Sequence, residues 1–282
     1  MNHPPIVLRT ISDLRANTAS WHSEGLTVGM IPTMGALHDG HLALVAEARR
    51  RVDRIVATIF VNPTQFAPTE DFGAYPRTEA SDIEKLAALG VEAVFVPTAR
   101  EMYPEGHATT IALAGPALGL ETDFRPHFFA GVATVVGKLL IGGFPDIAMF
   151  GEKDYQQLLV VRQMVADLHL PTEIVGLPTI RETDGLALSS RNAYLSPEER
   201  RTAASLPAVL NETAATIRAN GNAGEACRAG LAKLQSAGFR PDYLELRDAR
   251  TLAVPTPGGA EPLRLLAAAW LGKTRLIDNI AV

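Results

Sequence analysis

The stretch that decides the fold of this 282-residue chain is Pro32-Thr33-Met34-Gly35-Ala36-Leu37-His38-Asp39-Gly40-His41. The apolar run of residues 28–31 precedes it and predicts a short buried strand. Residues 42–51 follow, and the spacing of their apolar side chains predicts a helix with Asp39 as its N-cap. The chain therefore passes from a strand through a glycine-containing loop into a helix, with two histidines at the helix N-terminus.

These two histidines, His38 and His41, form an H-x-G-H pattern. A helix N-terminus carries backbone N–H groups without intrahelical partners, and its dipole favours a bound anion. Gly35 and Gly40 permit the backbone to approach such a group closely. The histidines would then donate to phosphate oxygens as charge accumulates during nucleotidyl transfer. Two other interpretations stay open here: a metal site built on the two histidines, and two surface histidines in a capped turn.

The composition describes a globular protein that handles small molecules. Apolar residues make up 47% of the chain, and a net charge of −5 without a basic stripe argues against nucleic acid as a partner. The single cysteine, Cys227, excludes a disulfide framework and fits a reducing compartment. Residues 1–21 lack the layout of a signal peptide, and no apolar run approaches the roughly 20 residues of a membrane span. We therefore expect a cytoplasmic protein with no membrane partner.

Strands and helices alternate through the first 178 residues. Buried strands are predicted at residues 28–31, 55–61, 91–97, 146–150 and 173–177, and helices at 11–23, 42–51, 80–89, 131–141 and 155–169. Residues 67–77 have the composition of a loop, and residues 102–120 receive no assignment. This alternation predicts an α/β fold, with a Rossmann-like doubly wound parallel sheet over residues 1–178 that binds nucleotide and substrate.

The pattern changes after Pro178. Residues 181–192 have the composition of a loop, and residues 196–199 combine the cap, the first-turn proline and the acidic residues of a helix start. Beyond them the pattern predicts helices at 198–219 and 223–237 and strands at 243–247, 263–269 and 274–280. We predict a smaller α+β domain over residues 179–282.

Polar residues follow three of the predicted strands, and ligands bind beyond the carboxyl ends of a parallel sheet. The clusters are residues 34–41, 62–65 and 151–154. Lys153 in the third cluster is a point charge suited to a phosphate, unless it only pairs with its acidic neighbours at the surface. Ser189, Ser190 and Arg191 offer two hydroxyls and a guanidinium to a triphosphate, unless their loop is merely solvated.

Neutral amides lie near the same predicted sheet edge, at Asn62, Gln65, Gln156 and Gln157. Such groups suit a hydroxylated substrate whose carboxylate must stay reactive, because an arginine would bind that carboxylate and weaken it as a nucleophile. Met34 would line an apolar pocket beside them. The alternatives are that Asn62 shapes the turn before a proline and that the glutamines are solvated on a helix.

These residues stand in blocks that resemble the AMP-forming pantoate–β-alanine ligases, or pantothenate synthetases, within the H-x-G-H nucleotidyl transferases. The H-x-G-H pattern alone marks only the wider group, whereas the blocks together are specific to the family. They are residues 32–41, Phe-Val-Asn-Pro-Thr-Gln-Phe at 60–66, Tyr-Pro-Arg-Thr at 75–78, Gly-Glu-Lys-Asp-Tyr-Gln-Gln at 151–157, Gly-Leu-Ala-Leu-Ser-Ser-Arg-Asn at 185–192 and Thr-Arg-Leu-Ile-Asp-Asn at 274–279.

The resemblance implies a two-step reaction in which ATP and pantoate form pantoyl adenylate and pyrophosphate, and β-alanine then displaces AMP. It implies Mg²⁺ with ATP, a homodimer and a C-terminal domain that acts as a lid. His38, His41 and Lys153 would be catalytic, and Gln65, Gln157, Asn62 and Met34 would bind substrate. The implied ATP-binding residues are Met34, Gly35, Ala36, Leu37, His38, Asp39, Gly40, His41, Gly151, Glu152, Lys153, Asp154, Ile180, Leu188, Ser189, Ser190 and Arg191.

The chain departs from the family pattern before the predicted central helix. The family usually has Arg-Pro-x-His-Phe there, whereas this chain places Phe128 where the histidine is expected and His127 one residue early. We leave both residues out of the predicted site. Asp82 lies near where an acidic contact to Mg²⁺ would be expected, but we assign no metal ligand. The alternatives to the ligase are another H-x-G-H adenylyltransferase and a non-catalytic nucleotide-binding regulator.

Overall fold

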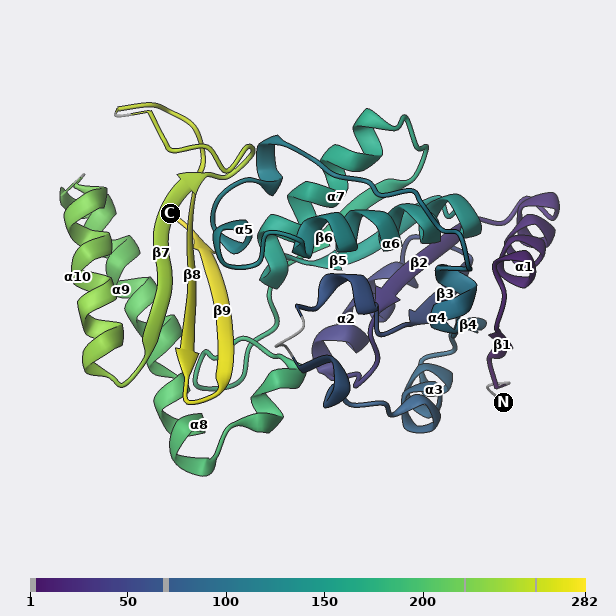
Figure 1. Cartoon of the computed structure of the whole chain (residues 1–282), viewed down its shortest axis with the longest axis horizontal. Helices are drawn as coiled ribbons and strands as arrows, with labels where there is room; N and C mark the ends of the chain where they lie inside the picture. Colours follow the sequence, from purple (N-terminus) through teal and green to yellow (C-terminus); the bar gives the residue numbers. More distant parts are fainter. Residues whose placement is uncertain (1–3, 68–70, 221, 257) are drawn as a thin grey trace. The chain divides into compact units, whose positions relative to one another are not determined.

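The computed structural model describes residues 4–67, 71–220, 222–256 and 258–282, so residues 68–70 of the predicted loop at 67–77 lie outside the described residues. The chain forms two compact units (Figure 1). Unit 1 takes in Met1–Glu152 and Val160–Pro178, and unit 2 takes in Lys153–Leu159 and Thr179–Val282. The units divide after Pro178, and residues 153–159, which the sequence placed with the first domain, group with unit 2. That the two parts act as a binding domain and a lid stays a prediction.

Unit 1 is built on a parallel six-stranded sheet with the strand order β1-β4-β3-β2-β5-β6. The strands are β1 (Ile6–Leu8), β2 (Val28–Thr33), β3 (Arg54–Ile59), β4 (Ala93–Phe95), β5 (Ile147–Gly151) and β6 (Glu173–Leu177). From β2 the chain moves outward to β3 and β4, and it later crosses to β5 and β6 on the other side of β2. Ligands bind at such a switch point, beyond the carboxyl ends of the strands. The predicted doubly wound parallel sheet is confirmed.

Helices cover both faces of this sheet (Figure 1). On one face, Val45 and Leu86 pack with Ile31 of β2 in the main core. On the other face, a Cβ at Gly143 would lie only 2.4 Å from Cε of Met30. Because successive residues of a strand point to opposite faces, both faces of β2 are buried, as its continuous apolar run predicts. The helices are α1 (Ile11–Ser23), α2 (Asp39–Ala48), α3 (Glu79–Ala88), α4 (Ala99–Met102), α5 (Glu121–Phe124), α6 (Phe128–Gly143) and α7 (Tyr155–Asp167), of which the last begins in unit 2.

Unit 2 packs helices on an antiparallel three-stranded sheet with the order β7-β8-β9. Leu206 and Leu210 form its core with Leu244 and Leu265 of the sheet. The predicted α+β class of this part is confirmed. The longest helices in the described ranges have 16 residues, and none is suited to span a bilayer. The elements are α8 (Pro197–Ala203), α9 (Ser205–Asn220), α10 (Ala223–Ser236), β7 (Arg240–Asp248), β8 (Leu263–Leu271) and β9 (Thr274–Ala281).

The sequence prediction missed the short elements β1, α4 and α5 and joined two helices into one. Strand β1 was missed because it has three residues, of which Ile6 and Val7 are exposed, and it pairs only with β4 at the sheet edge. The single helix predicted at 198–219 is wrong, since α8 ends at Ala203 and α9 begins at Ser205. Pro207 explains the break, because a proline ring inside a helix clashes with the carbonyl four residues earlier and lacks an N–H.

Candidate active site

A buried carboxylate holds the loop that follows β2. Asp82 of α3 is fully buried, and its Oδ2 and Oδ1 accept the backbone N–H groups of Ala36 at 2.8 Å and Leu37 at 2.9 Å. The hydroxyl of Thr78 donates to Oδ2 at 2.9 Å. Ala36 has a φ of +51°, in the left-handed region that disfavours residues with a Cβ. The carboxylate therefore stabilises an unfavourable backbone turn at the entrance to α2.

This arrangement does not support a Mg²⁺ contact at Asp82. Both carboxylate oxygens accept hydrogen bonds from the protein, and Nζ of Lys85 lies 3.9 Å from Oδ1 while it donates to the carbonyl of Leu37 at 2.7 Å. Within the described ranges, no group of three or more His, Cys, Asp or Glu side chains is placed to hold a metal ion. Asp82 is a structural anchor, and the two histidines find no third metal ligand in the described part of the chain.

His38 is the N-cap of α2, and the helix begins at Asp39, so the prediction that Asp39 is the cap is wrong. The reason is that an imidazole nitrogen can accept a backbone N–H as a carboxylate does. Nδ1 of His38 accepts the N–H of Gly40 at 3.1 Å, and Nδ1 of His41 accepts the N–H of His38 at 3.3 Å. The two rings lie with their centroids 4.1 Å apart. Both histidines are therefore fixed by the backbone at the start of the helix.

The same two hydrogen bonds determine where each ring carries its proton. A ring nitrogen that accepts an N–H has no hydrogen of its own, so the neutral forms of His38 and His41 are protonated at Nε2. Each ring then presents an Nε2–H donor. Together with the helix dipole, these donors favour a negatively charged group at the carboxyl end of β2.

A second cluster lies after β3, around the 3-10 turn η1 (Pro63–Gln65). The amide nitrogen of Asn62 donates to Oε1 of Gln65 and to the carbonyl of Gly131, both at 3.1 Å. The amide of Gln65 donates to Sδ of Met34 at 3.0 Å, which joins this cluster to the loop after β2. A thioether is a weak acceptor, so the Gln65 amide suits a stronger oxygen acceptor. Asn62 orients Gln65, and its direct contact with a substrate stays a prediction.

Tyr103 belongs to this cluster, although the sequence did not indicate it. Its hydroxyl donates to Oδ1 of Asn62 at 2.7 Å and lies 3.2 Å from the hydroxyl oxygen of Thr64. Burial raises the pKa of Tyr103, so the hydroxyl keeps its proton at neutral pH. Tyr103 lies in the stretch for which no element was assigned, and its bond to Asn62 joins positions 41 residues apart, so no local pattern marks it.

The N-terminus of α6 packs directly on η1. A Cβ at Gly131 would lie 2.5 Å from the carbonyl oxygen of Thr64, so only glycine fits there. Arg125 donates to the carbonyl of Gln65 at 3.2 Å, and its guanidinium carbon lies 3.8 Å from the ring centroid of Phe128. Phe128, which stands where the family usually has a histidine, thus packs against the arginine that holds the backbone of Gln65.

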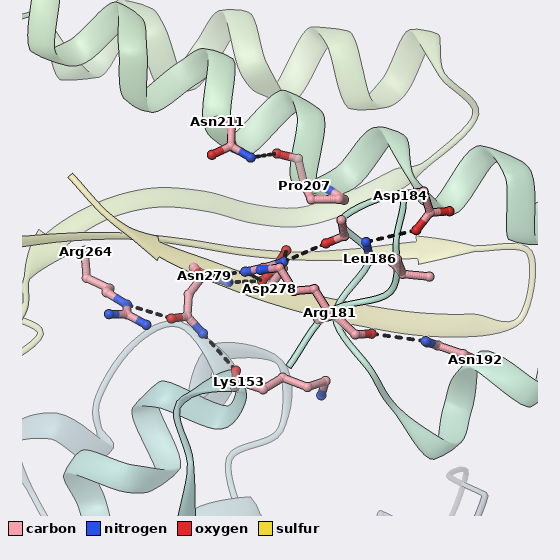
Figure 2. A network of polar contacts seen from close by, with 12 residues as sticks. Lys153, Arg181, Asp184, Leu186, Asn192, Pro207, Asn211, Arg264, Asp278 and Asn279 are labelled. Atoms are coloured by element: carbon pink, nitrogen blue, oxygen red, sulfur yellow. Dashed lines mark hydrogen bonds and ion pairs between the residues drawn. The ribbon is translucent and has the colours of Figure 1, made fainter. Parts of the chain in front are cut away.

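Unit 2 contains the predicted basic group. Lys153 lies in the 3-10 turn η4 (Glu152–Asp154), which follows β5 in the chain, and its Nζ is 3.8 Å from Oδ2 of Asp154. The side chain of Asp154 is 45% exposed, and ion pairs with so much access to water contribute little. The backbone carbonyl of Lys153 accepts the side-chain amide of Asn279 in β9 at 2.8 Å (Figure 2). Lys153 is therefore held by its backbone, while its ammonium makes a loose ionic contact with Asp154.

Residues 180–188, which precede η5 (Ser190–Tyr194), form a loop whose two ends are joined by a hydrogen bond. The N–H of Leu188 donates to the carbonyl of Ile180 at 2.9 Å. Arg181 forms a bidentate ion pair with Asp278 at 2.7 and 2.8 Å (Figure 2). It also donates to the carbonyl of Gly185 at 2.9 Å. These bonds hold residues 180–188 to β9.

The serine–arginine block that follows is also structured. Ser189 caps η5, since its hydroxyl accepts the N–H of Arg191 at 3.2 Å. Asn192 donates from its side chain to the carbonyl of Ala187 at 3.1 Å. The block is therefore an ordered turn with Ser190 and Arg191 at its start, and its contact with a triphosphate stays a prediction.

The structure places the predicted residues as two groups, one in each unit. In unit 1, Met34 joins residues 34–41 to Gln65 by a hydrogen bond. Gly151 is the last residue of β5, and Glu152 follows it. In unit 2, Gln157 is partly buried on α7, while Gln156 beside it is buried. Unit 2 also holds Lys153, Asp154, Ile180, Leu188, Ser189, Ser190 and Arg191.

The family model described as pantoate–β-alanine ligase matches residues 6–281. The chain belongs to this family. Pantothenate synthetases from Bradyrhizobium sp. strain BTAi1 and Caulobacter vibrioides are 56% and 53% identical to it over 283 and 281 residues, and the matches cover 100% and 99% of both chains. The family assignment made from the sequence blocks is confirmed.

Solved members of the pantoate–β-alanine ligase family have the same fold. The pantothenate synthetase of Thermus thermophilus is 46% identical with a TM-score of 0.90, and the match covers 98% of each chain. A ligase from Francisella tularensis, described as complexed with β-γ ATP and β-alanine, is 33% identical with a TM-score of 0.82 over 98% of this chain and 97% of that one. The likeness therefore extends over both units.

Proposed function

We propose that this chain catalyses the ATP-dependent condensation of pantoate with β-alanine to pantothenate, with release of AMP and pyrophosphate. The observation that carries the proposal is the pair of histidines at the N-terminus of α2 whose Nδ1 atoms accept backbone N–H groups, in a member of the pantoate–β-alanine ligase family. The relative from Francisella tularensis is described as complexed with β-γ ATP and β-alanine, which represent two of the three substrates.

In the first step, the ionised carboxylate of pantoate attacks the α-phosphorus of ATP in line. A bond forms between the carboxylate oxygen and phosphorus, and the bond to the bridging oxygen breaks as pyrophosphate leaves. No general base is needed, because the nucleophile is already charged. The Nε2–H groups of His38 and His41, with Lys153 and Arg191, stabilise the negative charge that accumulates on the phosphate oxygens.

In the second step, the neutral amine of β-alanine attacks the acyl carbon of pantoyl adenylate. The amide bond forms, the bond from the acyl carbon to the AMP oxygen breaks, and the amine nitrogen loses a proton. Acyl adenylates hydrolyse readily, so water must be kept from the intermediate between the two steps.

Pantoate is assigned to the neutral amides. Gln65 donates to the weak acceptor Met34, so a hydroxyl or carboxylate oxygen of pantoate would replace a poor partner with a better one. Asn62 and Tyr103 orient Gln65 from within the unit. Gln157 is assigned to pantoate by resemblance. ATP is assigned to residues 34–41, 151–154, 180 and 188–191.

Mg²⁺, a homodimer and a cytoplasmic location complete the proposal, on the strength of the family resemblance. Because the described ranges present no cluster of three metal-binding side chains, Mg²⁺ would be held mainly by phosphate oxygens of ATP, and we derive no step through it. A single cysteine, Cys227, fits a reducing compartment.

The test follows AMP and pyrophosphate in reactions with ATP and pantoate, with and without β-alanine. Without β-alanine we expect about one pyrophosphate per enzyme to form rapidly, and sustained AMP release should require the amine. Another adenylyltransferase would release no pyrophosphate with pantoate, and would release it only when its own acceptor is supplied. A nucleotide-binding regulator would form neither product.

Substitution of His38 by asparagine separates helix capping from catalysis. Asparagine is a favourable N-cap, so His38→Asn keeps the start of α2 while it removes the Nε2–H donor and the ring contact with His41. Pyrophosphate release should slow by about 10²–10³-fold, as it should in His41→Ala and Lys153→Ala. The unfolding midpoint should stay near that of the parent in His38→Asn and Lys153→Ala, whereas His41→Ala also loses the bond from the His38 N–H. The control is His22→Ala, because His22 pairs with Asp146 ahead of β5, at the opposite end of the sheet. A near-normal rate in any of the three site variants would remove that residue from the mechanism.

A further inference from the structure

The tail block at residues 274–279 has no role in the reaction described above, yet three of its polar residues, Thr274, Asp278 and Asn279, are buried. Asp278 and Asn279 in β9 are 2% and 3% exposed. Buried polar side chains are stable only when their donors and acceptors have partners. Their partners therefore show what the block does.

Asn279 bridges two groups that define the orientation of its amide. Its Oδ1 accepts from Nε of Arg264 at 2.7 Å, and its Nδ2 donates to the backbone carbonyl of Lys153 at 2.8 Å (Figure 2). The arginine nitrogen can only donate and the carbonyl can only accept, so the reversed amide would lose both bonds. The side chain thus ties a strand of the small sheet to the turn that carries Lys153.

Arg264 extends the same contact to the next residues of the chain. Its guanidinium carbon lies 4.1 Å from the ring centroid of Tyr155, and the Tyr155 hydroxyl donates to the carbonyl of Ala249 at 2.8 Å. Within unit 2, the turn at Lys153 is therefore held to β9, and Tyr155, the first residue of α7, is held to β8 and to the residue that follows β7.

Asp278 fixes the other phosphate-binding segment assigned to unit 2. It forms the bidentate pair with Arg181, and its Oδ1 also accepts the backbone N–H of Asn279 at 2.7 Å. Adjacent residues of one strand thereby hold the Lys153 turn and the segment that leads to Ser189 and Arg191. Asp278 and Asn279 therefore attach both segments to the same strand, β9.

We propose that Asn279 is a positioning residue for Lys153, whose backbone it holds so that the ammonium reaches the phosphates of ATP. This inference rests on the phosphate role proposed for Lys153. A flexible side chain such as lysine depends on its backbone for its reach, and misplacement of a charged donor by about 1 Å can cost up to 10²-fold in rate.

The test uses two substitutions with different side effects. Asn279→Ala removes both bonds, whereas Asn279→Asp keeps an acceptor for Arg264 and places an oxygen against the carbonyl of Lys153. The aspartate variant therefore keeps the packing of the strand and disrupts the Lys153 contact. The matched control is Asn211→Ala, because the Asn211 amide also donates to a backbone carbonyl in unit 2, that of Pro207 at 2.9 Å (Figure 2).

We expect both Asn279 variants to reduce kcat for pyrophosphate release about tenfold, with the KM for pantoate unchanged. Their unfolding midpoints should lie below that of Asn211→Ala, because Asn279 is buried and makes two bonds, whereas Asn211 is exposed and its amide makes one. Each variant is also combined with Lys153→Ala. If Asn279 acts through Lys153, its substitution costs less than twofold further in that background.

The outcomes separate this inference from the proposed function. If Lys153→Ala is slow and the Asn279 variants match the Asn211→Ala rate, the positioning role is refuted while the proposed function stands. The same holds if Asn279→Ala loses tenfold with and without Lys153, since its effect is then merely structural. If Lys153→Ala is as fast as the parent, the phosphate role of Lys153 fails and the positioning role fails with it.

Discussion

Substitution of Asp82 by asparagine should destabilise unit 1 by an amount that the hydrogen-bond pattern predicts. The carboxylate accepts Ala36 N–H on one oxygen and Leu37 N–H on the other, so an amide must turn its NH₂ group toward one of these donors. One buried N–H then loses its partner, which costs about 1–3 kcal/mol, and the bonds that remain lose the assistance of a charge. Relief from burying that charge offsets part of the loss, so we expect a net destabilisation of about 2–4 kcal/mol.

Urea unfolding followed by tryptophan fluorescence measures this loss. The chain has two tryptophans, Trp21 in unit 1 and Trp270 in unit 2, so a Trp270→Phe background reports unit 1 alone. With a urea dependence of about 2 kcal/mol per M, the midpoint should fall by roughly 1–2 M. Because the turn at Ala36 leads into His38, pyrophosphate release should also slow by about 10²-fold.

Asp53→Asn is the matched control in the same unit. Asp53 accepts the N–H of Thr27 at 2.9 Å and its hydroxyl at 2.7 Å on a single oxygen, so an amide oxygen can replace it without the loss of a bond. Its unfolding midpoint should stay near that of the parent. Equal midpoints for Asp82→Asn and Asp53→Asn would refute the reasoning that both oxygens of Asp82 are needed.

Three further predictions follow from other contacts. Tyr103→Phe removes one hydrogen bond to Asn62, so the KM for pantoate should rise about fivefold while that for ATP is unchanged; equal changes would contradict the orienting role of Tyr103. Gln157→Ala should raise the pantoate requirement far more than the ATP requirement in the same steady-state assay, and equal effects would refute its assignment to pantoate. Burial, with the nearby charge of Glu245, raises the pKa of Cys227. Because only the thiolate reacts with iodoacetamide, the alkylation rate of Cys227 should still rise at pH values where the rate for a free cysteine is already constant. Intact-mass kinetics from pH 7 to 10 check this, and a plateau at or below that of a free thiol would refute it.

The parts of the site that could be predicted have local signals. The H-x-G-H stretch lies between an apolar strand and an amphipathic helix, so its place at a sheet edge follows from neighbouring residues alone. The cap was assigned to the wrong residue because Asp39 and His38 can both accept a backbone N–H, and only the backbone geometry distinguishes them. The role of Phe128 was not predicted either, because its contact with Arg125 depends on how α6 packs on η1.

The sequence by itself determined the alternation of elements, the family and the residue types that would meet a nucleotide, because periodicity and motif spacing are properties of short stretches. Only the tertiary structure decided which side chains hold those residues in place. Asp82 and Ala36 are 46 residues apart, and Asn279 and Lys153 are 126 apart. Partners so distant leave no periodic pattern, and they are selected because a buried polar group is stable only where folding brings it a complementary donor or acceptor.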